Sequence, residues 1–257
     1  MAAPAPILVY DDAGADPFCV ESLLRACRDA HGAAERINAD ALLAGGWQEP
    51  KRCAALAFPG GADLPYAQKL NGRGNAMIRD YVHDGGRYLG ICAGAYYACR
   101  RIDFTGAELT VVEDRQLAFF PGTAVGPLAS LAPPYRPNDL SCAEVIALSA
   151  EGEVINALYW GGCRFDPEPA ADGVEVLARY PPPDGKDVAC VRLAVGRGVA
   201  VLCGVHVEVT AADFHTHSKT LPPPADRNRL AAQVERLACD DHRRRTLFRG
   251  FLQALGL

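Results

Sequence analysis

The chain has 257 residues, a formal net charge of −5 and a hydrophobic fraction of 49%. This length suits one large α/β domain or two small ones with a sizeable core, and the acidic balance gives no reason to expect nucleic acid or an anionic membrane as a partner. The first residues, Met1 to Pro6, contain no basic segment, and the apolar run Ile7 to Tyr10 is too short for a signal peptide or a membrane span. We therefore expect a cytoplasmic protein that has no membrane partner.

Short apolar runs and amphipathic segments alternate in the first hundred residues. Strands are predicted at residues 7–10, 33–38, 54–58 and 87–91, and helices at 17–30, 39–44 and 74–84. This alternation is typical of a flavodoxin-like, doubly wound and mainly parallel sheet, in which ligands bind beyond the carboxyl ends of the strands.

From about residue 105 to residue 210 the pattern changes to successive β-like runs separated by Gly, Pro and Asp turns. The runs are residues 108–112, 117–120, 143–148, 154–159, 174–180, 188–195 and 199–204. The turn Gly196-Arg197-Gly198 indicates a hairpin. We interpret this half as an antiparallel extension of the same sheet, so that residues 1–257 form a single α/β domain, closed by two C-terminal helices.

The ten cysteines are scattered, without close pairs at metal-ligand spacing, and most lie in apolar runs. We therefore expect free thiols in a reducing compartment. His215 and His217 form a His-x-His pattern, but no suitable third ligand stands nearby. We predict no metal and no cofactor, and we interpret residues 211–225 as a solvated lid loop.

Cys92 is the most informative residue of the chain. The apolar run Tyr88 to Ile91 leads directly into it, small residues surround it, and a helix-competent stretch follows. This is the pattern of a nucleophile elbow, a strained strand-to-helix turn that presents one side chain at the top of a sheet. A helix that begins just after the cysteine favours the thiolate. We predict that Cys92 is a nucleophile, against the alternative of a structural core cysteine.

A cysteine nucleophile needs a base, and the base needs a group that orients it. His206 follows the buried run Val199 to Gly204, so we expect it at the end of a strand. Glu208 points the same way in an extended segment and is placed to hold the imidazole. A plain polar pair is the alternative interpretation of His-x-Glu, but the glycine-bounded strand favours a dyad.

The predicted oxyanion hole consists of main-chain N–H groups. Gly60 and Gly61 end the predicted strand 54–58, where no side chain obstructs the approach of a reacting carbonyl. The N–H of Ala93, which follows the nucleophile, is the second donor. A simple strand-ending turn remains the alternative for Gly60 and Gly61.

With these residues in place, the chain resembles the class I glutamine amidotransferase-like superfamily. The resemblance rests on Gly90-Ile91-Cys92-Ala93-Gly94, on Pro59-Gly60-Gly61 and on His206-Val207-Glu208, where valine replaces the proline of His-Pro-Glu. Within that superfamily the chain is similar to the biotin-protein ligase N-terminal domain-like family, through Pro59 to Tyr66, Asn71-Gly72, Gly90 to Tyr97 and Tyr159 to Gly162. The resemblance implies a flavodoxin-like sheet and a Cys92–His206–Glu208 triad.

One position departs from the pattern of the glutaminases in that superfamily. They carry glutamine four residues after the nucleophile, where this chain has Tyr96. A plain glutaminase is therefore not expected, and biotin transfer is not predicted, because the ligase's own catalytic domain is absent. Asp63, Tyr66, Tyr96, Tyr97 and Trp160 are the candidate substrate-binding residues, with core or rim positions as the alternative for each.

These observations lead to two hypotheses of function. The first is a cysteine-dependent hydrolase or amidotransferase-like enzyme that acts on an amide, a thioester or a related acyl group of a small molecule. The second is a non-catalytic ligand-binding or regulatory module on the same fold, which Tyr96 and Val207 favour. A homodimer is a further partner hypothesis, although nothing in the sequence identifies an interface.

Overall fold

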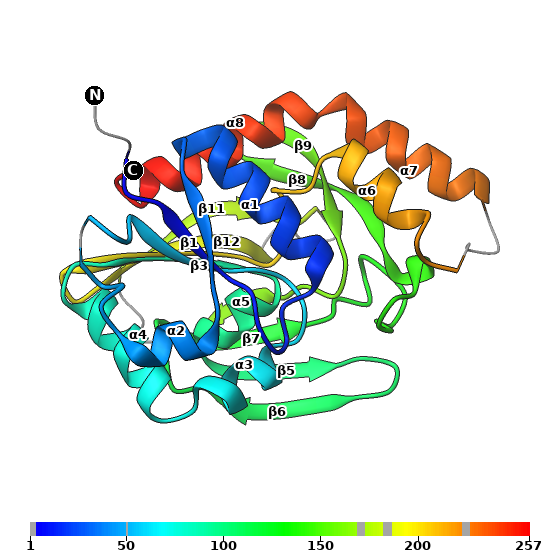
Figure 1. Cartoon of the computed structure of the whole chain (residues 1–257). Coiled ribbons are helices and arrows are strands. Elements are labelled where there is room, and N and C mark those ends of the chain that lie inside the picture. The colour runs from blue at the N-terminus through cyan, green and yellow to red at the C-terminus, as the bar shows by residue number, and fades with distance from the viewer. Residues whose placement is uncertain (1–3, 50, 169–172, 182–186, 223–226) are drawn as a thin grey trace.

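A nine-stranded sheet runs through the molecule in the order β2-β1-β3-β4-β13-β12-β11-β8-β9 (Figure 1). The computed structural model describes residues 4–49, 51–168, 173–181, 187–222 and 227–257. The parallel strands are β2 (Ala34–Ile37), β1 (Ile7–Tyr10), β3 (Ala55–Phe58), β4 (Arg87–Ile91) and β13 (Gly198–Cys203). All four pairings between them are parallel, which confirms the doubly wound half that the sequence predicts.

The other side of the large sheet is antiparallel. Its strands are β12 (Val188–Val195), β11 (Val174–Arg179), β8 (Glu144–Ala150) and β9 (Glu153–Tyr159). β12 and β13 pair in register from Cys190↔Cys203 to Val195↔Gly198, so the predicted hairpin is present. The antiparallel extension of a mainly parallel sheet is thereby confirmed.

A second sheet corrects the expectation that every later strand joins the first. It has four strands in the order β10-β7-β5-β6. They are β10 (Arg164–Pro167), β7 (Phe120–Gly126), β5 (Cys99–Thr105) and β6 (Thr110–Asp114). The predicted strands 108–112 and 117–120 are therefore shifted toward the C-terminus, and both belong to this smaller sheet.

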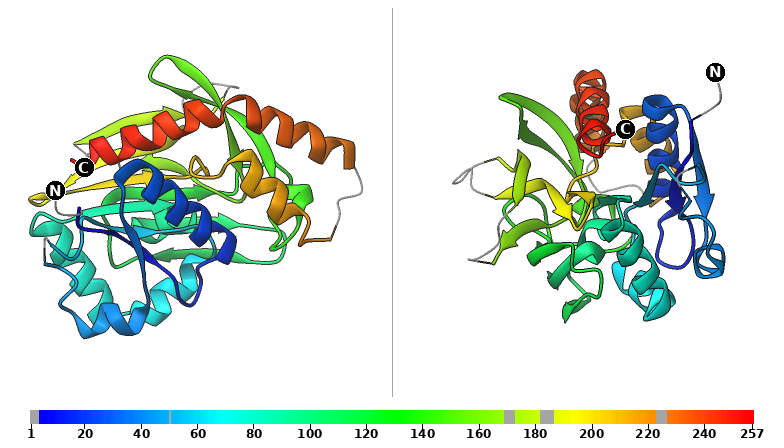
Figure 2. Two further views of the ribbon diagram at one scale, coloured as in Figure 1. Left: turned by 45° about the horizontal axis from the view of Figure 1, so that its top comes forward. Right: turned by 90° about the vertical axis from the view of Figure 1, so that its left-hand side faces the viewer.

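Helices cover both faces of the large sheet (Figures 1 and 2). On one face lie α1 (Pro17–His31), α6 (Ala211–Ser218), α7 (Arg227–Cys239) and α8 (Asp241–Ala254). On the other lie α2 (Ala39–Ala44), α3 (Asp63–Leu70), α4 (Arg73–His83) and α5 (Ala93–Ala98), next to the smaller sheet. A short 3₁₀ helix spans Leu140–Cys142. Apolar side chains on both faces of β1, β3 and β4 are buried, as expected for central parallel strands.

Local sequence explains where two of the site-forming helices begin. α1 starts at Pro17 after the N-cap Asp16, whose carboxylate accepts from the N–H groups of Phe18 and Cys19. α6 starts after Thr210, which forms a capping box with Asp213. Residues 211–218 are therefore helical, which corrects the predicted lid loop. Among the described residues, no helix is both long and apolar enough to cross a membrane.

Candidate active site

Four parallel strands bring their carboxyl ends together at one edge of the large sheet. β1 leads to the loop before Cys19, β3 to Gly60 and Gly61, β4 to Cys92, and β13 to His206. This edge of the sheet therefore brings together residues that are far apart in the chain, such as Cys19 in α1 and His206 after β13. This is the place where ligands bind in open α/β sheets.

Cys92 has the strained backbone of a nucleophile elbow. Its φ is +50° and its ψ is −106°, and it is the N-cap of α5. The turn is held from both sides, because the N–H of Cys92 donates to the Cys203 carbonyl at 2.8 Å and that of Gly94 to the Pro59 carbonyl at 3.0 Å. A methyl group on Gly94 would lie 2.2 Å from the Phe58 oxygen, so only glycine fits.

His206 and Glu208 form the dyad that their spacing predicts. Nδ1 of His206 lies 2.8 Å from Oε1 of Glu208, and the two side chains are 4% and 0% exposed. Burial opposes the charged imidazole, but the charges of Glu208 and Cys92 and hydrogen bonds with both raise the pKa of His206 well above its ordinary value. Since Nδ1 faces Glu208, Nε2 is the ring nitrogen left for Cys92. The imidazole therefore stands between a thiol and a carboxylate.

Charged side chains on the neighbouring helices α1 and α6 hold the backbone of this dyad in place. The Arg25 guanidinium on α1 donates to the main-chain oxygen of Glu208 and to the Asp213 carboxylate, the latter at 2.6 Å. Asp213 also accepts from the N–H and hydroxyl of Thr210, at 2.9 and 2.7 Å. Arg25 thus ties α1 and α6 to the turn that carries Glu208.

Two of the three predicted oxyanion donors line the space at the Cys92 thiol, and Gly60 does not. Gly61 and Ala93 both line the cavity at Cys92, and the described residues offer neither N–H a hydrogen-bond acceptor. Gly60 does not line the cavity, and its N–H is directed at the thiol of Cys19, where it lowers the pKa of that buried thiol against the larger effect of burial. Gly61 and Ala93 are therefore the pair with free donors.

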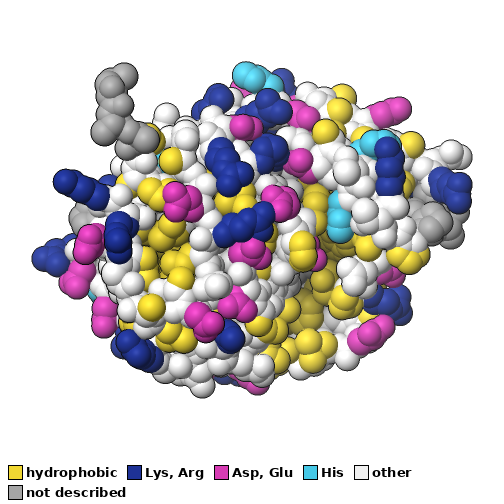
Figure 3. Space-filling view, in the orientation of Figure 1, with side chains coloured by type: hydrophobic (Ala, Val, Ile, Leu, Met, Phe, Trp, Pro, Cys, Tyr) yellow, Lys and Arg dark blue, Asp and Glu magenta, His cyan; other side chains and the backbone are white. Residues whose placement is uncertain are grey.

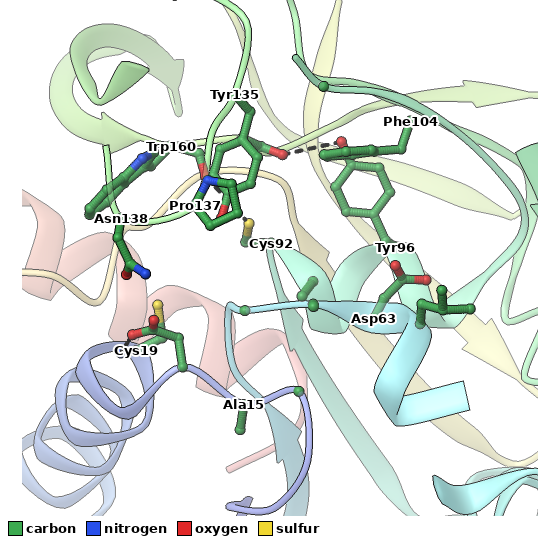
Figure 4. Close-up of a pocket in the computed structure, with 18 of the residues that line it drawn as sticks. Ala15, Cys19, Asp63, Cys92, Tyr96, Phe104, Tyr135, Pro137, Asn138 and Trp160 are labelled. Atoms are coloured by element: carbon green, nitrogen blue, oxygen red, sulfur yellow. Dashed lines mark hydrogen bonds between the residues drawn. The ribbon is translucent and has the colours of Figure 1, made fainter. Parts of the chain in front are cut away.

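A cavity of about 580 Å³ opens at Cys92. Figure 3 shows this face hollowed, with hydrophobic side chains gathered between α1 and α6 above and the smaller sheet below. In the close-up of Figure 4, Cys92 lies between Trp160 and Pro137 on one side and Tyr96 and Phe104 on the other. The cavity is thus placed to hold a small molecule against the thiol.

The whole chain matches one protein family. The model of the family described as biotin-protein ligase, N terminal, matches residues 5–257. The chain belongs to this family. A biotin-protein ligase of Schizosaccharomyces pombe (strain 972 / ATCC 24843) is 33% identical over 214 residues, which are 80% of this chain and 33% of the ligase. An uncharacterized protein of Chlamydia muridarum (strain MoPn / Nigg) is 36% identical over 208 residues, 79% of this chain and 80% of that protein.

Solved structures show that this member of the biotin-protein ligase N-terminal family has a glutamine amidotransferase-like fold. A glutamine amidotransferase of Methylobacillus flagellatus aligns with a TM-score of 0.55 at 14% identity, covering 99% of this chain and 96% of that one. A glutamine amidotransferase of Thermotoga maritima aligns with a TM-score of 0.54 at 12% identity, covering 98% and 96%. At these identities the likeness concerns the fold.

The structure divides the predicted substrate-binding residues of this family member into two groups. Asp63, Tyr96 and Trp160 line the cavity. Tyr66 and Tyr97 do not, which corrects their predicted place, because each is fully buried on the core side of its helix. The Tyr66 hydroxyl donates to the carbonyls of Pro59 and Gly60, both at 3.2 Å, so it supports the loop before the oxyanion donors.

Several lining residues have no counterpart in the sequence prediction. Cys19 and His217 line the cavity, and the His217 ring stacks on Phe18 with a centroid distance of 4.2 Å. Two signals were available for them: the position of Cys19 beyond a strand end, and the Thr210-x-x-Asp213 capping box before His217. Phe104 and Tyr135 gave no signal, because they reach the cavity only through the smaller sheet and the segment after it.

Among the residues that the structure describes, no three His, Cys, Asp or Glu side chains are placed to hold a metal ion.

Cys190 and Cys203 face each other across β12 and β13. Their sulfur atoms are 2.8 Å apart, and both are free thiols.

Proposed function

We propose that this chain is a cysteine-dependent acyl-transfer enzyme, a hydrolase or amidotransferase-like protein that acts on an amide or thioester. The observation that carries the proposal is the buried imidazole of His206, which lies 2.8 Å from Glu208 and interacts with Cys92 on its other side. A base oriented by a carboxylate next to a thiol is the arrangement that nucleophilic catalysis requires.

The chemistry follows from the position of each group. Sγ of Cys92 attacks the substrate carbonyl carbon, and the electron pair that moves to the oxygen is stabilised by the N–H groups of Gly61 and Ala93. The protonated His206 then gives its proton to the leaving amine or thiol, which yields a thioester on Cys92. A water molecule that His206 deprotonates attacks this thioester, and the acid leaves as Cys92 is restored.

Tyr96 argues against glutamine as the substrate. Its hydroxyl donates to the Gly161 carbonyl at 3.3 Å, and its side chain is almost fully buried beside the elbow. The ring therefore fills the position from which a glutamine side chain helps to hold the substrate in the glutaminases that the elbow resembles. An acyl compound of a different shape fits the site better.

The test is the rate at which iodoacetamide alkylates each cysteine near neutral pH, followed by peptide mapping. Cys92 is expected to react faster than Cys239, the one exposed cysteine among the described residues, and His206→Ala is expected to slow it. Cys92→Ala should also abolish turnover in a panel of small amides and thioesters. Equal rates at Cys92 and Cys239 would contradict the proposal.

The replacement of proline by Val207 and of glutamine by Tyr96 favours a second candidate, a ligand-binding module without turnover. In that case a small molecule would raise the melting temperature of wild type and of Cys92→Ala equally, and no member of the substrate panel would be consumed. The two measurements together distinguish the candidates.

A further inference from the structure

The lining of the cavity at Cys92 carries acidic side chains but neither lysine nor arginine among its described residues. The acidic side chains are those of Asp16, Asp63 and Glu108. Burial lowers the pKa of His217, only partly opposed by Asp16, so this histidine is neutral at neutral pH. The charge on His206 is balanced by Glu208. An anionic ligand would therefore meet no unpaired cation in this cavity.

Asp63 is a lining carboxylate that shares its counter-charge with a second acidic side chain. Oδ2 of Asp63 accepts from Nε of Arg115 at 2.7 Å, while NH1 of the same guanidinium donates to Glu113 at 3.0 Å. One guanidinium thus serves two carboxylates, which leaves a net negative charge. Arg115 itself does not line the cavity. Burial raises the pKa of Asp63, and the charge and hydrogen bond of Arg115 oppose this shift. A cationic ligand would therefore add a second positive charge beside a carboxylate that is partly removed from water.

Aromatic rings extend from Asp63 along one side of the cavity. The ring centroid of Phe104 is 5.8 Å from that of Tyr96 and 6.0 Å from that of Tyr135, both with edge contacts. In Figure 4 the three rings form a row beside Cys92, with the Asp63 carboxylate next to Tyr96. Such a row binds an apolar group by burial and also attracts a cation through the ring faces.

We infer that the cavity selects a substrate that carries a protonated amine on an apolar body, with the ammonium group at Asp63 and the body along Phe104 and Tyr135. Turnover of this ligand rests on the proposed acyl chemistry at Cys92, whereas the charge preference concerns binding alone. Carboxylates and phosphorylated thioesters are disfavoured, because no lysine or arginine of the described lining is available to neutralise them.

Three compounds of matched shape test this inference: 2-phenylethylamine, 2-phenylethanol and 3-phenylpropanoate, which are cationic, neutral and anionic. Each is added to the wild-type protein, and the rate of iodoacetamide labelling of Cys92 is measured by peptide mapping. The amine is expected to protect Cys92 at a concentration about tenfold lower than the propanoate, because an ammonium–carboxylate contact at a partly buried site is worth about a factor of ten. Labelling of the exposed Cys239 should be unaffected.

Two variants locate the preference. Asp63→Asn should remove the advantage of the amine over the alcohol, and Phe104→Leu should weaken protection by all three compounds. Asp84→Asn is the matched control, because Asp84 pairs with Arg197 on the surface and should change nothing. If Asp63→Asn does not fold, the comparison of the three compounds on the wild-type protein still tests the preference for the amine.

The outcomes separate this inference from the proposed function. If Cys92 reacts no faster than Cys239 without any compound, the acyl chemistry fails. If Cys92 reacts fast but the three compounds protect equally, or the propanoate protects best, the amine preference is overturned and the acyl chemistry stands.

Discussion

The Arg25 guanidinium donates a hydrogen bond to the main-chain oxygen of Glu208, 183 residues further along the chain. The same nitrogen donates to Asp213, which forms the capping box of α6 with the N-cap Thr210. Because Glu208 contacts His206, Arg25 holds the backbone of the dyad without contacting the imidazole or the thiol. Arg25 is therefore a positioning residue of the proposed active site.

Arg25→Gln is expected to slow the alkylation of Cys92 several-fold at neutral pH. It should also lower the free energy of unfolding by about 2 kcal/mol, because the hydrogen bonds of the guanidinium to Glu208, Asp213 and Asp29 are lost. Urea unfolding and peptide mapping measure the two effects. Arg36→Gln is the control, since Arg36 pairs with Asp11 and Glu21 on the surface. Equal alkylation rates in Arg25→Gln and wild type would show that Arg25 only stabilises the fold.

His206 and His217 both line the cavity, yet the fold shifts their pKa values in opposite directions. Glu208 and Cys92 overcome burial and raise the pKa of His206, whereas burial lowers that of His217. A histidine with a raised pKa adds stability below its unfolded pKa of about 6.5, and this stability is lost as the pH rises through the folded pKa. A lowered pKa has the opposite effect and reduces stability as the pH falls through about 6.5.

Urea unfolding at several pH values separates the two. The stability difference between wild type and His206→Asn should be larger at about pH 6 than at about pH 10, since the unfolded histidine titrates near 6.5. For His217→Asn, the free energy of unfolding relative to that of wild type should rise as the pH falls below about 6.5. The same pH trend in both variants would contradict the opposite shifts.

The sequence was sufficient to bring the proposed catalytic residues together because they follow buried strands in a parallel sheet. Cys92 comes directly after β4, and His206 comes three residues after the end of β13. The carboxyl ends of neighbouring parallel strands meet at one edge of the sheet. The sequence did not show which side of a helix faces the cavity. Tyr96 and Tyr97 are neighbours on α5, but only Tyr96 lines the cavity. One residue along a helix rotates a side chain by about 100°, so a motif cannot distinguish the two without the helix axis.

The smaller sheet was the part of the fold that the sequence did not predict. β5 begins at Cys99, directly after α5, and no turn residue marks the change from helix to strand. Its pairing with β7 is parallel and bridges a long connection, which no local pattern specifies. Phe104, which this strand places in the cavity, was therefore missed with it.

Tyr66→Phe is expected to loosen the loop that carries Gly60. The hydroxyl donates to two carbonyls of this loop, so its loss should lower the free energy of unfolding by about 1 kcal/mol and slow the alkylation of Cys92. Tyr180→Phe is the matched control, because its buried hydroxyl donates to Cys163 at 2.7 Å, away from that loop. It should cost similar stability and leave the alkylation rate unchanged. A slower rate in both variants would point to a general effect of stability.

Gly60 tests how closely the oxyanion loop fits the dyad. A methyl group on Gly60 would lie 2.6 Å from Cε1 of His206 and 2.8 Å from Sγ of Cys19, closer than van der Waals contact allows. Gly60→Ala should therefore displace the imidazole from Cys92, slow its alkylation and cost about 2 kcal/mol of stability by overpacking.

Gly250→Ala is the matched control for this substitution. Gly250 lies within α8, and a methyl group there would meet only Oε1 of Glu151, at 3.8 Å. Because alanine is the better helix former, this variant should be more stable than wild type by about 0.5–1 kcal/mol, with an unchanged alkylation rate. If Gly60→Ala also left the alkylation rate of Cys92 unchanged, the position of the imidazole beside Gly60 would not matter for the thiol. The thiol would then react without help from His206.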